Sequence, residues 1–425
     1  MKLIVKKSGL KGTVAIPGSK SHTIRAVAIA SLAEGASLIR DPLDSSDTRA
    51  AVACYRALGA EIDTSDPSCW RVSGTGGRIS APEEIIDVGN SGTTLRVAMG
   101  SAALAATDQS ISFTGDEQIR TRPVGPLIDA LNDLGANCVS LGDNGKVPVE
   151  IKGKLKGGKT IIAAATSQYL SSLLLCTPLA SADTEIDVSL LNEPGYVQMT
   201  LDWLDKQQII YENDSMRRFS INGNQSYKAF DAKIPADFSS ATFFLCGAAL
   251  AGDDVTLLGL DFADSQPDKG VVEYLREMGA EIEITDGSVR ISASGLHGAE
   301  LDMNETPDAL PAMAVTAAFA EGTTKLLNVA QARNKETDRI ACMARELKKM
   351  DVKVEELPDG LIIQGGRPKP AELHGWADHR IVMALSLAGL KLDGQLSIDT
   401  AEAISVTFPD YVELMRSIGA DMTLE

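Results

Sequence analysis

The chain repeats one pattern of apolar and polar positions. An amphipathic helix ends in Leu, Met or Ile followed by Gly-Ala, and β-forming residues come next. A glycine directly after the last helical residue is typical of a helix C-terminus, where the backbone turns left-handed. The pattern recurs every 68 to 76 residues, in clear or degraded form, at Gly59, Gly135, Gln208, Gly279, Asp351 and Gly419. This spacing predicts six similar α/β modules, three in each of two domains.

Each module also contains a second helix that follows a loop of small or polar residues. These loops lie at 17–21, 89–93, 164–168, 235–239, 306–308 and 376–379. They are rich in Ser, Thr and Asp, the side chains that cap helix N-termini. A helix N-terminus offers unpaired amides and a partial positive charge, so six such starts predict a shared anion-binding surface.

Composition narrows the class of protein. A chain of 425 residues with 44% hydrophobic, 23% charged and 4% aromatic residues is long enough for two domains with aliphatic cores. The net charge of −18 disfavours nucleic-acid and anionic-membrane partners. The apolar runs are shorter than a membrane span requires. The first residues turn polar too quickly for an export signal, so we expect a cytoplasmic protein.

The six cysteines are predicted to be buried thiols. They form no CxxC pair, and no His stands near them at metal-ligand spacing. A disulfide framework and a metal site are therefore disfavoured.

The segment from Pro17 to Arg25 carries the first candidate chemistry. We expect Ser21 to cap a helix, Arg25 to share its face, and Lys20 to project from the preceding loop. Together with backbone amides, these groups match what a phosphate requires. The alternative is a capped surface helix whose charges are only solvated.

Further polar junctions follow along the chain. Glycines at 89 and 92 allow close backbone approach to a ligand, and Arg122 precedes Pro123, which can open a helix. A carboxylate, Asp308, stands at a helix start, and carboxylates and cations alternate from 334 to 339 and from 378 to 380. Each junction alone could be an ordinary loop with weak surface ion pairs.

Taken in order, these motifs resemble those of the 5-enolpyruvylshikimate-3-phosphate synthases. PGSKSxxxR, GNSGTxxR, RPxGxLxxAL, SQY, PDA, KETDR, DHR and TFPDY occur between residues 12 and 411. The resemblance implies an α/β (α+β) fold of two similar domains, each an inside-out α/β barrel of three βαβαββ repeats. One domain would comprise 1–17 and 235–425, the other 18–234, with the active site in the cleft between them.

The resemblance implies a transferase of the shikimate pathway, in aromatic amino acid biosynthesis. It would move the enolpyruvyl (carboxyvinyl) group of phosphoenolpyruvate to the 5-hydroxyl of shikimate-3-phosphate through a tetrahedral intermediate and release phosphate. No metal or organic cofactor is implied. The partners would be the two small substrates, and we expect a monomer.

The resemblance also assigns residues. The catalytic set would be Asp308, Glu336 and Lys20. The shikimate-3-phosphate set would be Lys20, Ser21, Arg25, Thr166, Ser167, Gln168, Tyr196, Asp308 and Lys335. The phosphoenolpyruvate set would be Lys20, Gly92, Arg122, Gln168, Arg339 and Arg380. Asp308 would take the hydroxyl proton, and either Glu336 or Lys20 would protonate C3 of phosphoenolpyruvate.

A charge count gives a further expectation. The two substrates together carry roughly −5 to −6, and six cations stand in the assigned sets: Lys20, Arg25, Arg122, Lys335, Arg339 and Arg380. The empty site would be strongly cationic, and substrate binding would drive domain closure.

Some positions depart from the family pattern. Thr166 replaces a Ser, and Glu193 stands where a phosphate-contacting Ser is expected. Gln331 or Ala332 replaces an Asn, and Val406 replaces a Lys. Gly92, by contrast, matches the GNSGTxxR motif. A glycine rather than an alanine there leaves room for the inhibitor glyphosate, which competes with phosphoenolpyruvate in this family, so we expect sensitivity to it.

Two rival readings stay open. A UDP-N-acetylglucosamine enolpyruvyl transferase would typically have Asn after the first Lys and Cys in its mobile loop, whereas this chain has Ser21 and no Cys from 115 to 123. A non-catalytic phosphate-binding repeat protein would not need the carboxylates Asp308 and Glu336 beside its cations. RNA-binding relatives of the repeat fold are disfavoured by the charge of −18.

Overall fold

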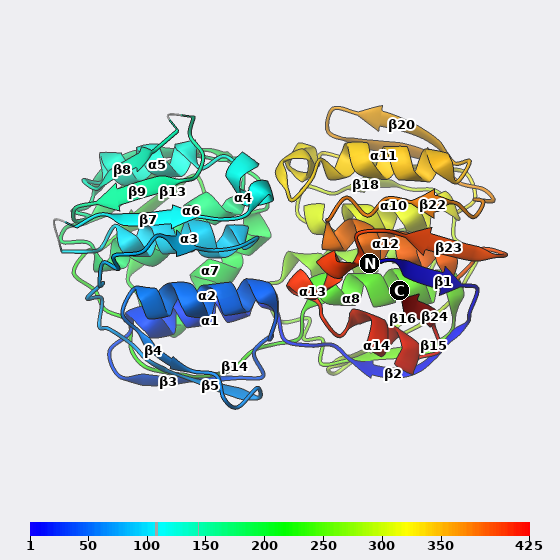
Figure 1. Ribbon diagram of the computed structural model, residues 1–425, viewed down its shortest axis with the longest axis horizontal. Coiled ribbons are helices and arrows are strands. Elements are labelled where there is room, and N and C mark those ends of the chain that lie inside the picture. The colour runs from blue at the N-terminus through cyan, green and yellow to red at the C-terminus, as the bar shows by residue number, and fades with distance from the viewer. Residues whose placement is uncertain (107–108, 143) are drawn as a thin grey trace. The chain divides into compact units, whose positions relative to one another are not determined.

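The computed structural model describes residues 1–106, 109–142 and 144–425. The chain divides into two compact units, a discontinuous unit of Met1–Pro17 and Pro235–Glu425 and a continuous unit of Gly18–Ile234. Each unit has its own hydrophobic core, built mainly from aliphatic side chains. The described residues form six four-stranded sheets, three in each unit. Figure 1 draws the helices and strands of both units.

The continuous unit contains three sheets. Their strand orders are β14(Asp231–Lys233)-β3(Ala36–Arg40)-β5(Cys69–Ser73)-β4(Glu61–Asp63), β6(Ile86–Asp87)-β7(Ile111–Thr114)-β9(Val149–Lys152)-β8(Asn137–Ser140) and β10(Gly158–Ala164)-β11(Thr184–Leu191)-β13(Arg218–Ile221)-β12(Tyr211–Asp214). Its helices are α1(Lys20–Leu32), α2(Ser46–Ala57), α3(Gly92–Ala102), α4(Glu117–Thr121), α5(Gly125–Asp133), α6(Ser167–Cys176) and α7(Pro194–Lys206), with a 3-10 turn at Thr177–Leu179.

The discontinuous unit repeats this plan. Its sheets are β22(Glu372–Leu373)-β23(Gln395–Ile398)-β1(Leu3–Lys6)-β24(Asp421–Leu424), β16(Glu281–Thr285)-β17(Ser288–Ser292)-β15(Gly252–Leu258)-β2(Leu10–Ala15) and β18(Glu300–Asp302)-β19(Thr323–Leu327)-β21(Gly360–Gln364)-β20(Lys353–Leu357). Its helices are α8(Phe238–Ala251), α9(Val271–Glu277), α10(Leu310–Ala318), α11(Arg339–Lys349), α12(His379–Gly389), α13(Ile404–Thr407) and α14(Tyr411–Ser417), with 3-10 turns at Pro267–Gly270, Pro307–Ala309, Ala330–Asn334 and Ala401–Ala403.

Every sheet has the same mixture of strand directions. One outer pair, such as β10 with β11, is parallel, and the other two pairs are antiparallel. A parallel pair needs a helical crossover, and α6 supplies it between β10 and β11. This is the βαβαββ repeat that the family resemblance implied, and the mixed α/β class is confirmed. The sheets remain separate, and the described residues form no closed barrel.

The central helices of each unit are buried on all sides. Every residue of α1 from His22 to Leu32 is buried, as is every residue of α12 and of α8 up to Leu250. The strands, by contrast, alternate between buried and more exposed positions, as β10 does. A charged side chain on such a helix is removed from water and needs partners inside the protein.

All six predicted helix ends are left-handed. The backbone angle φ is 108° at Gly59, 98° at Gly135, 93° at Gly279 and 107° at Gly419. It is also positive at the two degraded copies, 58° at Gln208 and 66° at Asp351. The repeat therefore conserves the backbone turn even where the glycine is lost.

Two predicted helix starts need correction. Ser19, not Ser21, caps α1, because its side chain accepts the backbone N–H of His22, and Lys20 is already the first helical residue. Pro123 does not open a helix, since α5 begins at Gly125. The six cysteines are free, and all except the partly exposed Cys69 are buried, as predicted.

Candidate active site

Lys20 lies at the start of α1, beside a carboxylate that belongs to none of the predicted sets of site residues. Its ammonium nitrogen is 3.0 Å from Oδ2 of Asp47 in α2. Both side chains are largely buried, with 15% of Lys20 and 7% of Asp47 exposed. The pair holds Lys20 in place before any ligand binds.

Arg25 is a buried guanidinium whose hydrogen bonds all go to uncharged oxygens. It donates to Oγ1 of Thr200 at 2.9 Å and to the carbonyl oxygens of Tyr196 at 2.9 Å and Ser21 at 3.1 Å. A longer bond of 3.4 Å reaches Oγ of Ser171. Burial lowers the pKa of Arg25 to about 10, because neutral acceptors do not replace the lost hydration. An anionic ligand would supply the charge that this site lacks.

Gly92 allows two guanidinium groups to approach the start of α3. A Cβ atom at this position would lie 2.5 Å from Nη1 of Arg122 and 2.5 Å from Nη1 of Arg96. Arg96 in turn donates to Oε1 of Gln168 at 2.8 Å, and its guanidinium lies over the ring of Tyr169. The starts of α3 and α6 are thus joined around two buried arginines.

The start of α6 already binds a carboxylate. Oε2 of Glu193 accepts the Ser167 hydroxyl at 2.8 Å, the Ser167 backbone N–H at 3.2 Å and the Thr166 hydroxyl at 3.4 Å. Thr166 caps the helix, as predicted. Glu193, which stands where the family pattern has a Ser, therefore binds Thr166 and Ser167, two residues assigned to the sugar phosphate.

In the discontinuous unit, one buried guanidinium binds three carboxylates. Arg339 donates to Oδ2 and Oδ1 of Asp378 at 2.9 and 3.2 Å, to Oδ1 of Asp308 at 2.8 Å, and to Glu336. Arg339 is 1% exposed and Asp378 is not exposed at all. Asp378 also caps α12 by accepting the backbone N–H of Arg380 at 2.9 Å. We call Asp308, Lys335, Glu336, Arg339, Asp378 and Arg380 the carboxylate cluster.

Asp308 is the point at which the cations of the carboxylate cluster converge. Its carboxylate lies 2.8 Å from Arg339, 3.2 Å from Arg380 and 3.6 Å from Lys335. Burial alone would raise the pKa of Asp308, but the charges of Arg380, Lys335 and Arg339 outweigh it and hold the pKa well below its usual range. Asp308 is therefore ionised at neutral pH.

Within each unit, carboxylates lie beside several of the cations that the sequence assigned to the substrates. Lys20 is paired with Asp47, and the carboxylate cluster contains three cations and three carboxylates. The charge count made from the sequence included six cations but left out the carboxylates Asp47, Asp308, Glu336 and Asp378. Lys20, Lys335, Arg339 and Arg380 each lie within ion-pair distance of a carboxylate of the same unit, so the positive charge within each unit is smaller than the count of cations alone implies.

Comparison with known proteins identifies the family. The family model described as EPSP synthase (3-phosphoshikimate 1-carboxyvinyltransferase) matches residues 4–415. The chain belongs to the EPSP synthase family. The 3-phosphoshikimate 1-carboxyvinyltransferase of Acetivibrio thermocellus is 54% identical over 423 residues, covering 100% of this chain and 99% of the relative. That of Ruminiclostridium cellulolyticum is 49% identical, with both chains covered completely. The solved EPSP synthase of Acinetobacter baumannii has a TM-score of 0.83 at 28% identity and full coverage of both chains.

Within this EPSP synthase family member, each unit brings its own share of the predicted residues together. In the continuous unit, Arg122 directly follows the end of α4. The N-terminal turns of α1, α3, α6 and α7, with the residue before α6, carry the other predicted residues, namely Lys20, Ser21, Arg25, Gly92, Thr166, Ser167, Gln168 and Tyr196. The carboxylate cluster contains Asp308, Lys335, Glu336, Arg339 and Arg380. Sequence reasoning missed Asp47, Arg96 and Asp378 as site residues. Arg96 is part of the GNSGTxxR motif, and Asp378 is part of the DHR motif. Both are charged residues in or next to a largely apolar helix, and this pattern could have marked them as candidate site residues.

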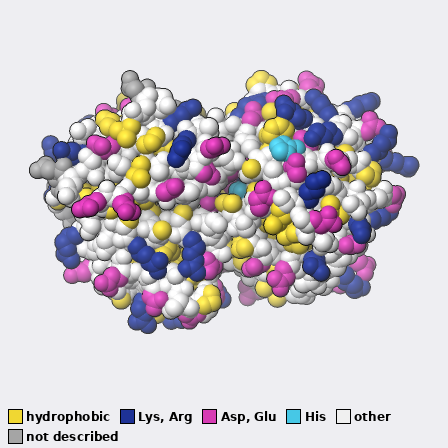
Figure 2. All heavy atoms as spheres, in the orientation of Figure 1, with side chains coloured by type: hydrophobic (Ala, Val, Ile, Leu, Met, Phe, Trp, Pro, Cys, Tyr) yellow, Lys and Arg dark blue, Asp and Glu magenta, His cyan; other side chains and the backbone are white. Residues whose placement is uncertain are grey.

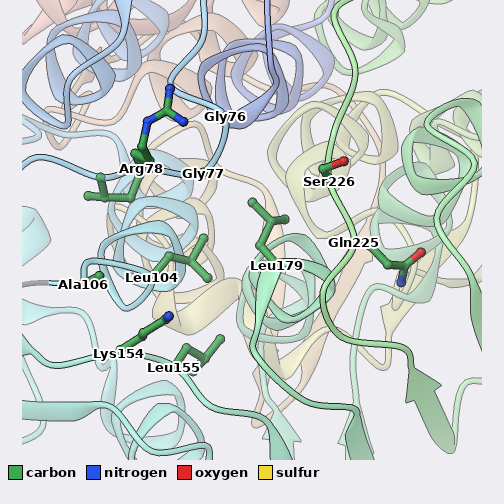
Figure 3. Close-up of a pocket in the computed structure, with 11 residues that line it drawn as sticks. Gly76, Gly77, Arg78, Leu104, Ala106, Lys154, Leu155, Leu179, Gln225 and Ser226 are labelled. Carbon is green, nitrogen blue, oxygen red and sulfur yellow. The ribbon is translucent and has the colours of Figure 1, made fainter.

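Other features of the molecule lie outside these residues. A cavity of about 430 Å³ in the continuous unit is lined by Arg78, Leu104, Lys154, Leu179 and neighbouring residues, none of them a predicted site residue (Figure 3). Figure 2 shows Lys and Arg interspersed with Asp and Glu on the face drawn. The described residues contain no group of three or more His, Cys, Asp or Glu side chains suited to a metal ion. Within the same residues, no helix combines the length and apolar character needed to cross a membrane.

Proposed function

We propose that this protein transfers the carboxyvinyl group of phosphoenolpyruvate to the 5-hydroxyl of shikimate-3-phosphate and releases inorganic phosphate. The reaction belongs to the shikimate pathway of aromatic amino acid biosynthesis. The observation that carries the proposal is the carboxylate cluster, in which an ionised Asp308 is surrounded by three cations in a chain of the EPSP synthase family. Such a group can hold anions and move a proton at the same place.

Shikimate-3-phosphate would be bound through its phosphate, carboxylate and hydroxyl groups. We assign Arg25 to an anionic group of this substrate, because its buried charge has only neutral partners. Lys20 and Ser21 lie at the same helix start. The remaining assigned contacts are Thr166, Ser167, Gln168, Tyr196, Asp308 and Lys335.

Phosphoenolpyruvate would be bound by cations from both units. Gly92 leaves space for Arg122, and Lys20, Gln168 and Arg380 complete the assigned set. Arg339 already donates four hydrogen bonds to carboxylates. We therefore propose that Arg339 mainly holds Asp308 and Glu336 in place. To bind phosphoenolpyruvate, Arg339 would have to exchange one of these carboxylates for the substrate.

The chemistry requires one proton to be added and one removed. The 5-hydroxyl oxygen bonds to C2 of phosphoenolpyruvate as its proton passes to Asp308, and C3 accepts a proton from Glu336 or Lys20. The tetrahedral adduct then loses a proton from C3 while the bond from C2 to the phosphate oxygen breaks. Substrate anions bound to Lys335 and Arg380 would offset their charges and raise the pKa of Asp308, which makes it a better base.

The proposal also covers the cellular location and the oligomeric state of the protein. Both substrates are multiply charged, and such ions do not cross a lipid bilayer unaided. We therefore place the enzyme in the cytoplasm, acting as a monomer on small-molecule substrates alone. Domain closure around the substrates would exclude water from the adduct.

A phosphate-release assay tests the proposed activity. Purified protein is incubated with phosphoenolpyruvate and either shikimate-3-phosphate or UDP-N-acetylglucosamine. Release only with shikimate-3-phosphate is the expected result. Release with the UDP-sugar would support the rival transferase, and release with neither acceptor would support a non-catalytic phosphate-binding protein.

A further inference from the structure

The anion-binding start of α6 is occupied by the protein's own carboxylate. Oε2 of Glu193 accepts the Ser167 hydroxyl at 2.8 Å and the Ser167 backbone N–H at 3.2 Å, and the Thr166 hydroxyl lies at 3.4 Å. The first amides of a helix and its capping hydroxyls are the donors that a phosphate group would use. Glu193 therefore fills a place that suits an anionic ligand.

The backbone holds this carboxylate in place. Glu193 has φ 58° and ψ 47°, a left-handed conformation that residues other than glycine rarely adopt. It immediately precedes Pro194, the first residue of α7, and its carbonyl accepts the Tyr196 N–H at 3.1 Å. Only 1% of the residue is exposed. An unfavourable backbone conformation and a buried carboxylate persist together only because the surrounding contacts fix them.

We infer that Glu193 is a specificity-determining residue, an internal anion that the phosphate of the acceptor substrate must displace from the start of α6. The inference rests on the proposed function, in which Thr166 and Ser167 bind the sugar phosphate. A phosphate with a charge of about −1.5 to −2 cannot share these donors with a carboxylate without repulsion. Glu193 thus weakens acceptor binding and leaves phosphoenolpyruvate binding unaffected.

Two variants separate the charge of Glu193 from its side chain. Glu193→Gln removes the charge and keeps the shape. Glu193→Gly removes the side chain and places at φ 58° the residue that tolerates it best. Glu185→Gln is the matched control, because it makes the same charge change in the same unit on β11, where Glu185 is 43% exposed and paired with Lys159.

Steady-state kinetics gives the first readout. The KM for shikimate-3-phosphate should fall about tenfold in Glu193→Gly, which corresponds to about 1.4 kcal/mol, and by less in Glu193→Gln. The KM for phosphoenolpyruvate should not change, and Glu185→Gln should match the unaltered protein. An unchanged or increased KM for shikimate-3-phosphate in both Glu193 variants would overturn the inference.

Inorganic phosphate gives a second readout that needs no turnover. Ligand bound only to the folded state raises the thermal midpoint, so phosphate should raise it more in Glu193→Gly than in the unaltered protein or Glu185→Gln. The same rise in all three proteins would overturn the inference even if the enzyme turns over shikimate-3-phosphate. A larger rise in Glu193→Gly without any turnover would instead support the internal anion and refute the proposed function.

Discussion

Replacing Arg339 by Gln removes a buried positive charge from three carboxylates at once. The guanidinium of Arg339 is 1% exposed and donates to Asp308, Glu336 and Asp378. Removing one member of a buried ion pair typically costs 3–5 kcal/mol, because the remaining charge stays buried without compensation. We therefore expect Arg339→Gln to lower the free energy of unfolding by about 3–5 kcal/mol at pH 7.

The pH dependence follows from the pKa of Asp378. Burial alone would raise this pKa, but the charge of Arg339 outweighs it and holds the pKa below its usual range. In the unaltered protein, Asp378 thus contributes stability above the unfolded pKa of about 3.9, and this is lost as pH falls through the lower folded value. Without Arg339 the folded pKa rises, so the carboxylate can take up a proton at higher pH. The stability difference should be largest near pH 7 and should narrow towards pH 5.

Urea unfolding followed by circular dichroism measures this difference at both pH values. Arg290→Gln is the control, because Arg290 pairs with Asp254 at 2.8 Å in the same unit but is 58% exposed. An exposed pair contributes at most about 1 kcal/mol. The reasoning is refuted if Arg339→Gln costs no more than the control, or if its cost is the same at pH 5 as at pH 7.

Three further predictions concern single positions. Gln208→Gly should raise the free energy of unfolding by about 1 kcal/mol, because Gln208 is left-handed with φ 58°; a lower urea midpoint would contradict this. Gly92→Ala should raise the KM for phosphoenolpyruvate at least tenfold and weaken inhibition by glyphosate, because the new methyl group displaces Arg96 and Arg122 by close to 1 Å; unchanged inhibition constants would argue against this geometry. Asp308→Ala should lose most turnover yet still bind shikimate-3-phosphate by calorimetry, and near-normal turnover would remove Asp308 from its assigned role.

Local patterns in the sequence predicted the repeating architecture well. A helix end followed by a left-handed residue depends on neighbours in the chain, so the spacing located even Gln208 and Asp351, where glycine is absent. The helix cap next to Lys20 was displaced by two residues, because Ser19 and Ser21 are both suitable caps and only the backbone selects between them.

The ion-pair partners of Lys20 and Arg339 could not be predicted from local sequence patterns. Asp47 is 27 residues from Lys20, and Asp378 is 39 residues from Arg339. Such pairs are formed by the packing of helices, and no local spacing encodes them. The motifs therefore located the cations and the carboxylates Asp308 and Glu336, whereas Asp47 and Asp378 became evident as their partners only in the structure.

A crystal structure with shikimate-3-phosphate and inorganic phosphate tests most directly whether groups from both units act on one pair of substrates. We predict that Arg25 and Gln168 of the continuous unit and Asp308 and Lys335 of the discontinuous unit all lie about 3 Å from the same sugar molecule. A sugar phosphate bound by residues of one unit alone would contradict the proposed reaction.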